Sequence, residues 1–95
     1  MTVHLLIKGL VQGVFYRASA KQVAEEAGIK GWIRNTKEGH VEAVCQGSED
    51  AVNGFISWCR KGPPRAEVEE VVVSERPETV FEVFEVIRGV HGGTP

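Results

Sequence analysis

The order in which the apolar residues change their spacing limits the folds open to this chain more than any other feature. Residues 3–7 are apolar and β-branched enough for a buried strand. The next segment has helical spacing up to a stop at Gly28, with apolar positions at Ala20, Val23, Ala24 and Ala27. Residues 31–36 and 40–46 are typical of two strands joined by a short hairpin connection. The first half therefore predicts strand, helix, strand, strand.

The second half adds a helix and further β structure. Ser48 is suited to cap a helix with an acidic first turn, a basic last turn and a Gly-Pro-Pro stop at residues 62–64. Residues 68–74 and 80–87 predict strands on either side of a turn, although Glu82 and Glu85 interrupt the alternation of the second. Residues 88–95 show no packing pattern, so we expect a flexible tail there.

Together these segments predict an α+β fold. The order strand, helix, strand, strand, helix, strand favours a ferredoxin-like βαββαβ sandwich. In that layout two helices cover one face of a mainly antiparallel sheet, here of four to five strands. A chain of 95 residues can bury one core without metal or disulfide staples. We therefore expect residues 1–95 to form a single domain.

Charge and hydropathy exclude several classes of function. A formal net charge of −2 argues against broad binding to nucleic acid, which requires a basic face. No apolar run approaches the ~20 residues that span a bilayer, and the N-terminus does not look like a secretion signal. We expect a cytoplasmic protein with no membrane partner, and a monomer by default.

The metal-ligating residue types are few and scattered. Cys45 and Cys59 lack the close spacing of a redox or zinc motif and are better explained as small buried residues. His4, His40 and His91 have no second ligand at metal spacing. We therefore expect neither a metal nor a cofactor.

The stretch from Gly9 to Arg17 indicates an anion site. It places a glycine-containing loop and an arginine where a helix is about to begin. The first amides of a helix lack intrahelical acceptors and carry the positive end of the dipole, so a cation there is unfavourable unless an anion lies beside it. Gly9 and Gly13 allow positive φ, which turns successive N–H groups inward around phosphate oxygens. A guanidinium can then add a forked pair of hydrogen bonds.

Two separated motifs stand in order along the chain: residues 9–17 (GLVQGVFYR) and residues 31–41 (GWIRNTKEGHV), followed by Gly47 and residues 62–66 (GPPRA). Together they resemble the paired signature of the acylphosphatase family. The resemblance extends over roughly residues 3–89. One departure is Tyr16, where the family more often has phenylalanine. The resemblance implies the same fold with a fifth strand, and the hydrolysis of small acyl phosphates to a carboxylate and inorganic phosphate by metal-independent, in-line attack of water.

The resemblance also implies roles for particular residues. The phosphate-binding loop would comprise Val11, Gln12, Gly13, Val14, Phe15, Tyr16 and Arg17. Arg17 would be catalytic together with Asn35, which would position the attacking water. From the residues alone, Asn35 is better explained as a turn residue that makes an Asx hydrogen bond. Its catalytic role therefore rests on the resemblance.

Two alternatives keep the fold but change the function. One is a carbamoyl-phosphate-handling module, like the acylphosphatase-like domain of the much larger hydrogenase maturation carbamoyltransferases. The other is a non-catalytic ferredoxin-like module that binds RNA or a regulatory ligand. Readout of RNA would require exposed aromatic residues on the sheet and a basic rim, and neither is evident in the sequence.

Overall fold

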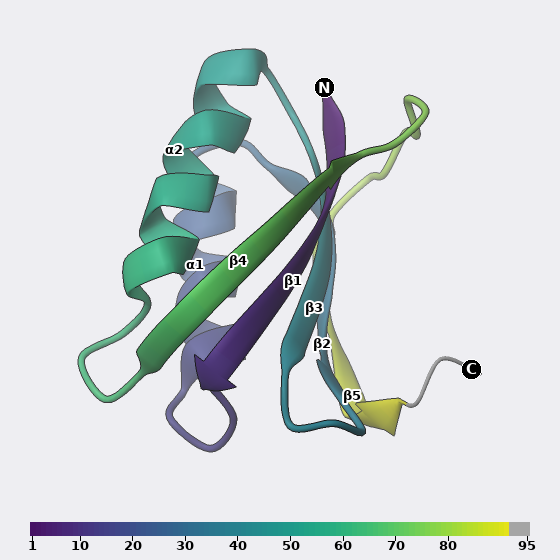
Figure 1. Cartoon of the computed structure of the whole chain (residues 1–95). Coiled ribbons are helices and arrows are strands. Elements are labelled where there is room, and N and C mark those ends of the chain that lie inside the picture. The colour runs from purple at the N-terminus through teal and green to yellow at the C-terminus, as the bar shows by residue number, and fades with distance from the viewer. Residues whose placement is uncertain (92–95) are drawn as a thin grey trace.

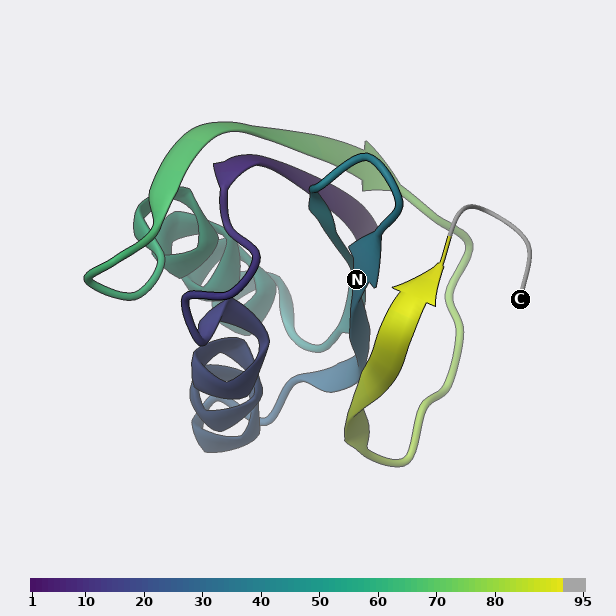
Figure 2. The same cartoon turned by 90° about the horizontal axis from the view of Figure 1, so that it is seen from below.

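The structure, a computed structural model, describes residues 1–91 and contains two layers (Figure 1). The elements follow the predicted order, including both strands predicted after the second helix: β1 (Thr2–Leu10), α1 (Tyr16–Glu26), β2 (Lys30–Thr36), β3 (Val41–Gln46), α2 (Glu49–Lys61), β4 (Glu67–Glu75) and β5 (Phe84–His91). Both helices lie against the same face of the sheet, which curves partly around them (Figure 2). The predicted α+β sandwich is confirmed.

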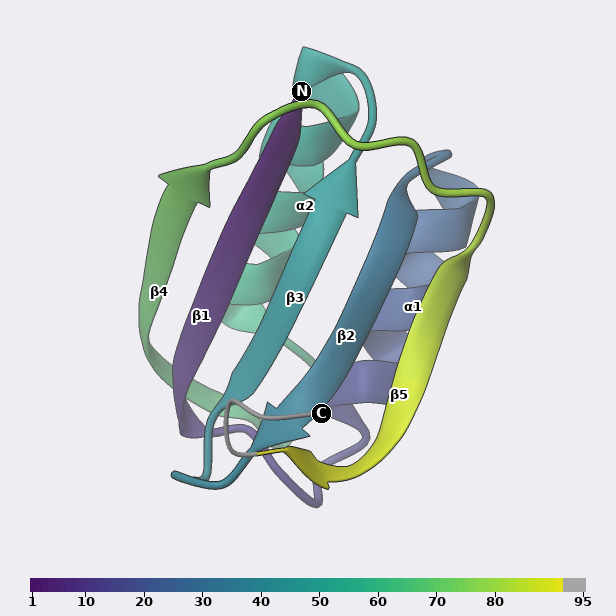
Figure 3. The ribbon, with the colours of Figure 1, turned by 90° about the vertical axis from the view of Figure 1, so that its right-hand side faces the viewer.

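The five strands form one mixed sheet in the order β4-β1-β3-β2-β5. Three of its pairs are antiparallel, namely β1 with β3, β1 with β4 and β2 with β3, whereas β2 and β5 are parallel. The chain leaves β4 at one edge of the sheet and crosses its end to reach β5 at the opposite edge (Figure 3). Because β5 enters after this crossing, it runs in the direction of β2.

The prediction for the last strand was wrong at both ends. β5 begins at Phe84, not at residue 80, and it continues to His91, through residues that were predicted to be tail. Val80 and Val83 lie in the connection and are exposed, while Phe84 is buried, so the inward alternation starts later than the sequence suggested. Backbone pairing with Asn35 and Thr36 extends β5 to Val90 and His91, where the side-chain pattern gives no signal. Residues 92–95 of the predicted tail lie outside the described residues.

The two helices begin in different ways. α2 has the predicted cap, in which the Ser48 hydroxyl accepts a hydrogen bond from the amide of Ala51 at 3.2 Å, and acidic residues fill its first turn. α1 has no acidic residue in its first turn and no side-chain cap; its N-cap residue is Phe15. The start of α1 therefore lacks the side-chain cap and the acidic first turn that stabilise the start of α2.

Tyr16 joins the two helices within the core. Its ring is 1% exposed and lies 5.3 Å from the ring of Trp58, measured between centroids. Its hydroxyl donates a hydrogen bond of 2.7 Å to the carbonyl oxygen of Cys59 in α2. Cys45 and Cys59 are free and buried, as expected, and burial raises the pKa of the Cys59 thiol to about 12.

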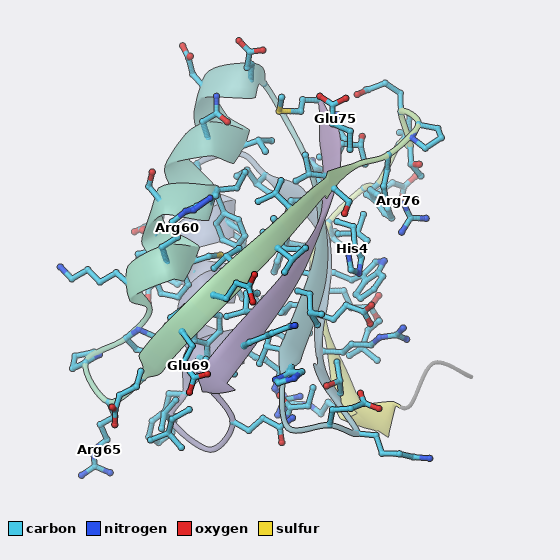
Figure 4. All side chains as sticks on the ribbon, in the orientation of Figure 1. His4, Arg60, Arg65, Glu69, Glu75 and Arg76 are labelled. Carbon is cyan, nitrogen blue, oxygen red and sulfur yellow. The ribbon has the colours of Figure 1, made fainter. Side chains whose placement is uncertain are left out.

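The face of the sheet turned away from the helices carries a polar cluster, around His4 in Figure 4. Glu42 on β3 is at its centre. The Nε2 atom of His4 lies 2.7 Å from one carboxylate oxygen of Glu42, and Nε of Arg34 donates to the other at 2.8 Å. The guanidinium of Arg34 also lies over the ring of Trp32, 4.7 Å from its centroid. This cluster joins three neighbouring strands, β1, β3 and β2.

Candidate active site

The loop between β1 and α1 has an unusual backbone conformation. A bulge in the β1–β4 pairing falls between Lys8 and Gly9, and a Cβ atom at Gly9 would lie 2.2 Å from the carbonyl oxygen of Glu67. Gly13 has φ 75°, and Phe15 has φ 62° and ψ 23°. Within residues 1–91, Phe15 is the only residue other than glycine with positive φ. Left-handed conformations of bulky residues are costly and concentrate at functional sites.

The amides of this loop are left without backbone acceptors. The first backbone hydrogen bond of α1 runs from the amide of Ser19 to the carbonyl of Phe15, at 3.0 Å. Within residues 1–91, no backbone–backbone hydrogen bond outside the regular elements is donated by an amide of residues 12–18. Such a run of N–H groups at the positive end of a helix favours an anion.

Arg17 lies beside these amides and is held in place by β5. Its Nη1 donates a hydrogen bond of 3.2 Å to the carbonyl oxygen of Ile87. A guanidinium has five N–H donors, so this one bond leaves others for a ligand. No carboxylate in residues 1–91 forms a salt bridge with it. The charge of Arg17 is thus available to an incoming anion.

Asn35 lies within β2 and does not form the predicted turn. Its Oδ1 atom is buried and has no hydrogen-bond partner among residues 1–91. The turn is closed by Thr36 instead, whose amide donates to the carbonyl of His40 at 2.9 Å and whose hydroxyl accepts from the amide of His40 at 3.1 Å. The interpretation of Asn35 as an Asx-turn residue was therefore wrong.

Arg17 and Asn35 come together in one cleft of about 860 Å³ between α1 and β5. Five members of the predicted loop line it: Val11, Gly13, Phe15, Tyr16 and Arg17. Val14 packs against the core instead. The cleft thus contains both predicted catalytic side chains and most of the predicted loop.

Gln12 has a role that the sequence did not reveal. Its Nε2 donates hydrogen bonds to the carbonyl oxygens of Thr36, at 2.9 Å, and His40, at 2.7 Å. Its side chain therefore fixes the loop to the β2–β3 hairpin, next to Asn35, and what remains for a ligand is its backbone amide. No sequence pattern indicates these bonds, because Gln12 lies 24 and 28 positions before the two residues that accept them.

Other cleft residues come from α1, from the connection before β5 and from β5. They include Lys21, Glu25, Val83, Phe84, Val86 and Arg88. Lys21 follows Arg17 by one helical turn, so the spacing could have placed it on the same wall. Its ammonium forms an ion pair of 3.5 Å with Glu25. The β5 residues could not have been assigned to the cleft, because the position of β5 beside α1 depends on its pairing with β2, more than fifty residues earlier in the chain.

Within residues 1–91, no group of three or more histidine, cysteine, aspartate or glutamate side chains is arranged to hold a metal ion. In the same part of the chain, no helix has the length and apolar character that crossing a membrane requires. The charged group in the cleft next to the loop amides is a guanidinium, which suits a phosphoryl group.

Comparison with known proteins agrees with this geometry. Residues 3–86 match the acylphosphatase family model. The chain is 47% identical over 89 residues to an acylphosphatase of Methylococcus capsulatus, a match that covers 93% of this chain and 97% of that protein. An acylphosphatase of Haloquadratum walsbyi is 46% identical over 85 residues, covering 90% of this chain and 91% of the relative.

Solved structures give the same result. An acylphosphatase from Coxiella burnetii superposes with a TM-score of 0.87 at 36% identity and covers 90% of each chain. Full-length HypF in its phosphate- and nucleotide-bound form has a TM-score of 0.85 at 26% identity; the match covers 97% of this chain but only 12% of HypF. The architecture therefore occurs both as a chain of this size and as a small part of a much larger one.

Proposed function

The chain belongs to the acylphosphatase family and has acylphosphatase activity, and from that premise we propose how its residues hydrolyse the carboxyl–phosphate bond of small acyl phosphates. One observation carries the proposal. The loop with its unpartnered amides, Arg17 and Asn35 border a single cleft, and the Oδ1 atom of Asn35 is buried without a partner.

The loop and Arg17 bind the phosphoryl group. Amides of residues 11–17 donate to its oxygens at the positive end of α1, and the guanidinium of Arg17 donates from the side of β5, where Ile87 holds it. Charge spreads over the equatorial oxygens in the transition state of phosphoryl transfer. Donors fixed in advance around those oxygens stabilise that charge without reorganisation.

Asn35 orients the water that attacks phosphorus. A buried acceptor without a partner costs about 1–3 kcal/mol, so Oδ1 of Asn35 favours a donor in the cleft. A water molecule that donates to this oxygen is held with its lone pair toward the phosphoryl group. Gln12 keeps the loop and the hairpin in register, so that the bound phosphoryl group and the water stay in line.

The proposed reaction requires no metal, cofactor or covalent nucleophile. A carboxylate is a good leaving group, so the leaving oxygen needs no strong general acid. The positive field that a metal supplies in other phosphoryl-transfer enzymes comes here from Arg17 and the amides. The bound phosphoryl group itself accepts the proton of the water.

We further propose that the chain acts as a single domain and as a monomer in the cytoplasm. Its partners would be small-molecule acyl phosphates and inorganic phosphate, without nucleic acid; a net charge of −2 supports the last point. The carbamoyl-phosphate module and the non-catalytic module are not favoured. The curated relatives that match nearly end to end are acylphosphatases.

The decisive experiment measures hydrolysis of benzoyl phosphate and acetyl phosphate, with and without EDTA, at several concentrations of inorganic phosphate. Turnover should survive the chelator, and phosphate should compete with either substrate. Loss of activity in EDTA that magnesium or zinc restores would contradict the metal-independent mechanism. Purely noncompetitive inhibition would place the anion site elsewhere.

A further inference from the structure

Phe15 exposes a large apolar ring at the edge of the proposed phosphate site. Its relative exposure is 76%, although phenylalanine is among the residues most often buried. The ring therefore adds little to the stability of the core. It lines the same cleft as Arg17 and Asn35.

The backbone at Phe15 makes this exposure more informative. The left-handed conformation, with φ 62° and ψ 23°, is unfavourable for any residue with a Cβ atom, and glycine adopts it freely. A phenylalanine at this point thus combines backbone strain with an unburied side chain. Neither cost is offset by packing in the folded protein, whereas a ligand in the cleft would bury the ring.

The direction of the reaction places the acyl group on the open side of the cleft. In-line displacement puts the attacking water and the leaving oxygen on opposite sides of phosphorus. The Oδ1 atom of Asn35, which we have assigned to the water, is fully buried. The acyl group consequently leaves toward solvent, on the side where an exposed residue of the loop can meet it.

We propose that the ring of Phe15 packs against the acyl group and is a specificity-determining residue. It favours acyl phosphates with aromatic or bulky apolar acyl groups over those with small ones. The inference rests on the proposed function, because it assigns the acyl end of the same substrate. The phosphoryl end is recognised by the amides and Arg17 whatever the acyl group is.

The test compares kcat/KM for benzoyl phosphate and acetyl phosphate in the wild type, Phe15→Ala, Phe15→Leu and Phe15→Tyr. The ratio of the two values should fall at least about fivefold in Phe15→Ala, because an aromatic contact is lost for one substrate only. Phe15→Tyr retains the ring and should keep the wild-type ratio within about twofold, and Phe15→Leu should lie between them. Circular dichroism verifies that each variant is folded.

Two control variants separate a specific contact from general apolar exposure. Leu10→Ala removes another exposed apolar side chain, 54% exposed at the end of β1 and outside the cleft lining, and should not change the ratio. Val83→Ala removes an exposed side chain that lines the cleft on the connection before β5. A shift of the ratio in Val83→Ala and not in Phe15→Ala would overturn the proposal.

The outcomes also distinguish a failure of this inference from a failure of the proposed function. If the wild type hydrolyses neither substrate, the proposed function fails. If it hydrolyses both and Phe15→Ala lowers both values equally, the function stands and the assignment of Phe15 to the acyl group is wrong.

Discussion

Arg17 lies in the first turn of α1, where the positive end of the helix dipole repels a cation. The structure shows how the protein holds it there. Its guanidinium is oriented by a carbonyl of β5, and no carboxylate within residues 1–91 neutralises it. The unfavourable interaction with the helix dipole is a cost of up to about 1 kcal/mol, which a bound anion removes. Arg17 is thus arranged for ligand binding at the expense of the unliganded protein.

Replacement of Arg17 by lysine tests whether the planar fork matters. Lysine keeps the charge but cannot reach Ile87 and the phosphoryl oxygens with the same rigid set of donors. We expect kcat/KM for benzoyl phosphate to fall by at least about tenfold, or ~1.4 kcal/mol, and inorganic phosphate to inhibit more weakly. Steady-state kinetics with near wild-type values would reduce Arg17 to a surface residue.

Asn35→Ala separates catalysis from structure. Removal of a buried acceptor that has no protein partner should hardly lower the melting temperature. If Asn35 positions the water, kcat should drop about 100-fold or more while the inhibition constant of phosphate changes little. A lower melting temperature with normal turnover would instead return Asn35 to a purely structural role.

At the residue scale, the sequence predicted roles that depend on local structure and missed those that depend on contacts between distant residues. Arg17 could be placed because its sign conflicts with a helix start, which is a local property. The role of Asn35 required the family resemblance, since the same asparagine also fits a turn. The link from Gln12 to Thr36 and His40 joins residues 24 and 28 positions apart, and no local rule predicts such a bond.

At the scale of elements, the start of α1 is fixed to the last turn of α2 by Tyr16. Its hydroxyl satisfies the carbonyl of Cys59, one of the last carbonyls of α2, which lack intrahelical partners. Burial raises the pKa of the Tyr16 hydroxyl well above its ordinary value, which favours the neutral form that donates this hydrogen bond. The same residue thereby positions the loop that precedes α1.

Tyr16→Phe, which restores the more usual family residue, should be destabilising in this chain. It leaves the buried carbonyl of Cys59 without its donor, at a cost of about 1–2 kcal/mol. For a domain of this size that corresponds to roughly 4–15 °C in melting temperature. Thermal denaturation followed by circular dichroism measures the effect, and an unchanged midpoint would show that the hydroxyl is dispensable.

Elements with strong end signals were predicted well, and those without them were not. α2 has a serine cap, charged turns of the expected sign and a glycine stop, and its predicted bounds are confirmed. β5 has no such signals. Its position depends on pairing with β2, more than fifty residues earlier in the chain, so the apolar pattern before it was mistaken for its beginning.

At the scale of the whole molecule, the polar cluster on the face of the sheet turned away from the helices makes stability depend on pH. Burial raises the pKa of Glu42, but hydrogen bonds from His4 and Arg34 outweigh this effect and hold the pKa below its ordinary value of 4.5. A carboxylate with a lowered pKa in the folded state stabilises that state above its unfolded pKa. The stabilisation is lost as the pH falls through the lowered value.

Glu42→Gln should therefore change how stability depends on pH. We expect the free energy of unfolding at pH 7 to fall by about 1–2 kcal/mol, because hydrogen bonds to a charged group are lost. Below pH 4.5 the wild type should lose stability more steeply than the variant. Urea titrations between pH 3 and 7 measure both effects. Glu38→Gln, at an exposed glutamate of the hairpin turn with no ion pair in residues 1–91, is the control, and matching curves for the two variants would contradict the assignment.

The bond between Arg17 and Ile87 spans 70 residues and joins the anion site to an edge strand. An edge strand has one neighbour, so β5 can detach while the rest of the sheet stays paired. An anion on Arg17 fixes the guanidinium, and the guanidinium in turn holds the backbone of β5. Amide hydrogen exchange in β5 should therefore slow when inorganic phosphate is added, whereas exchange in β4, the opposite edge, should not. Occupancy of the site would then be measurable as slower amide exchange in an edge strand that Arg17 holds through its bond to Ile87.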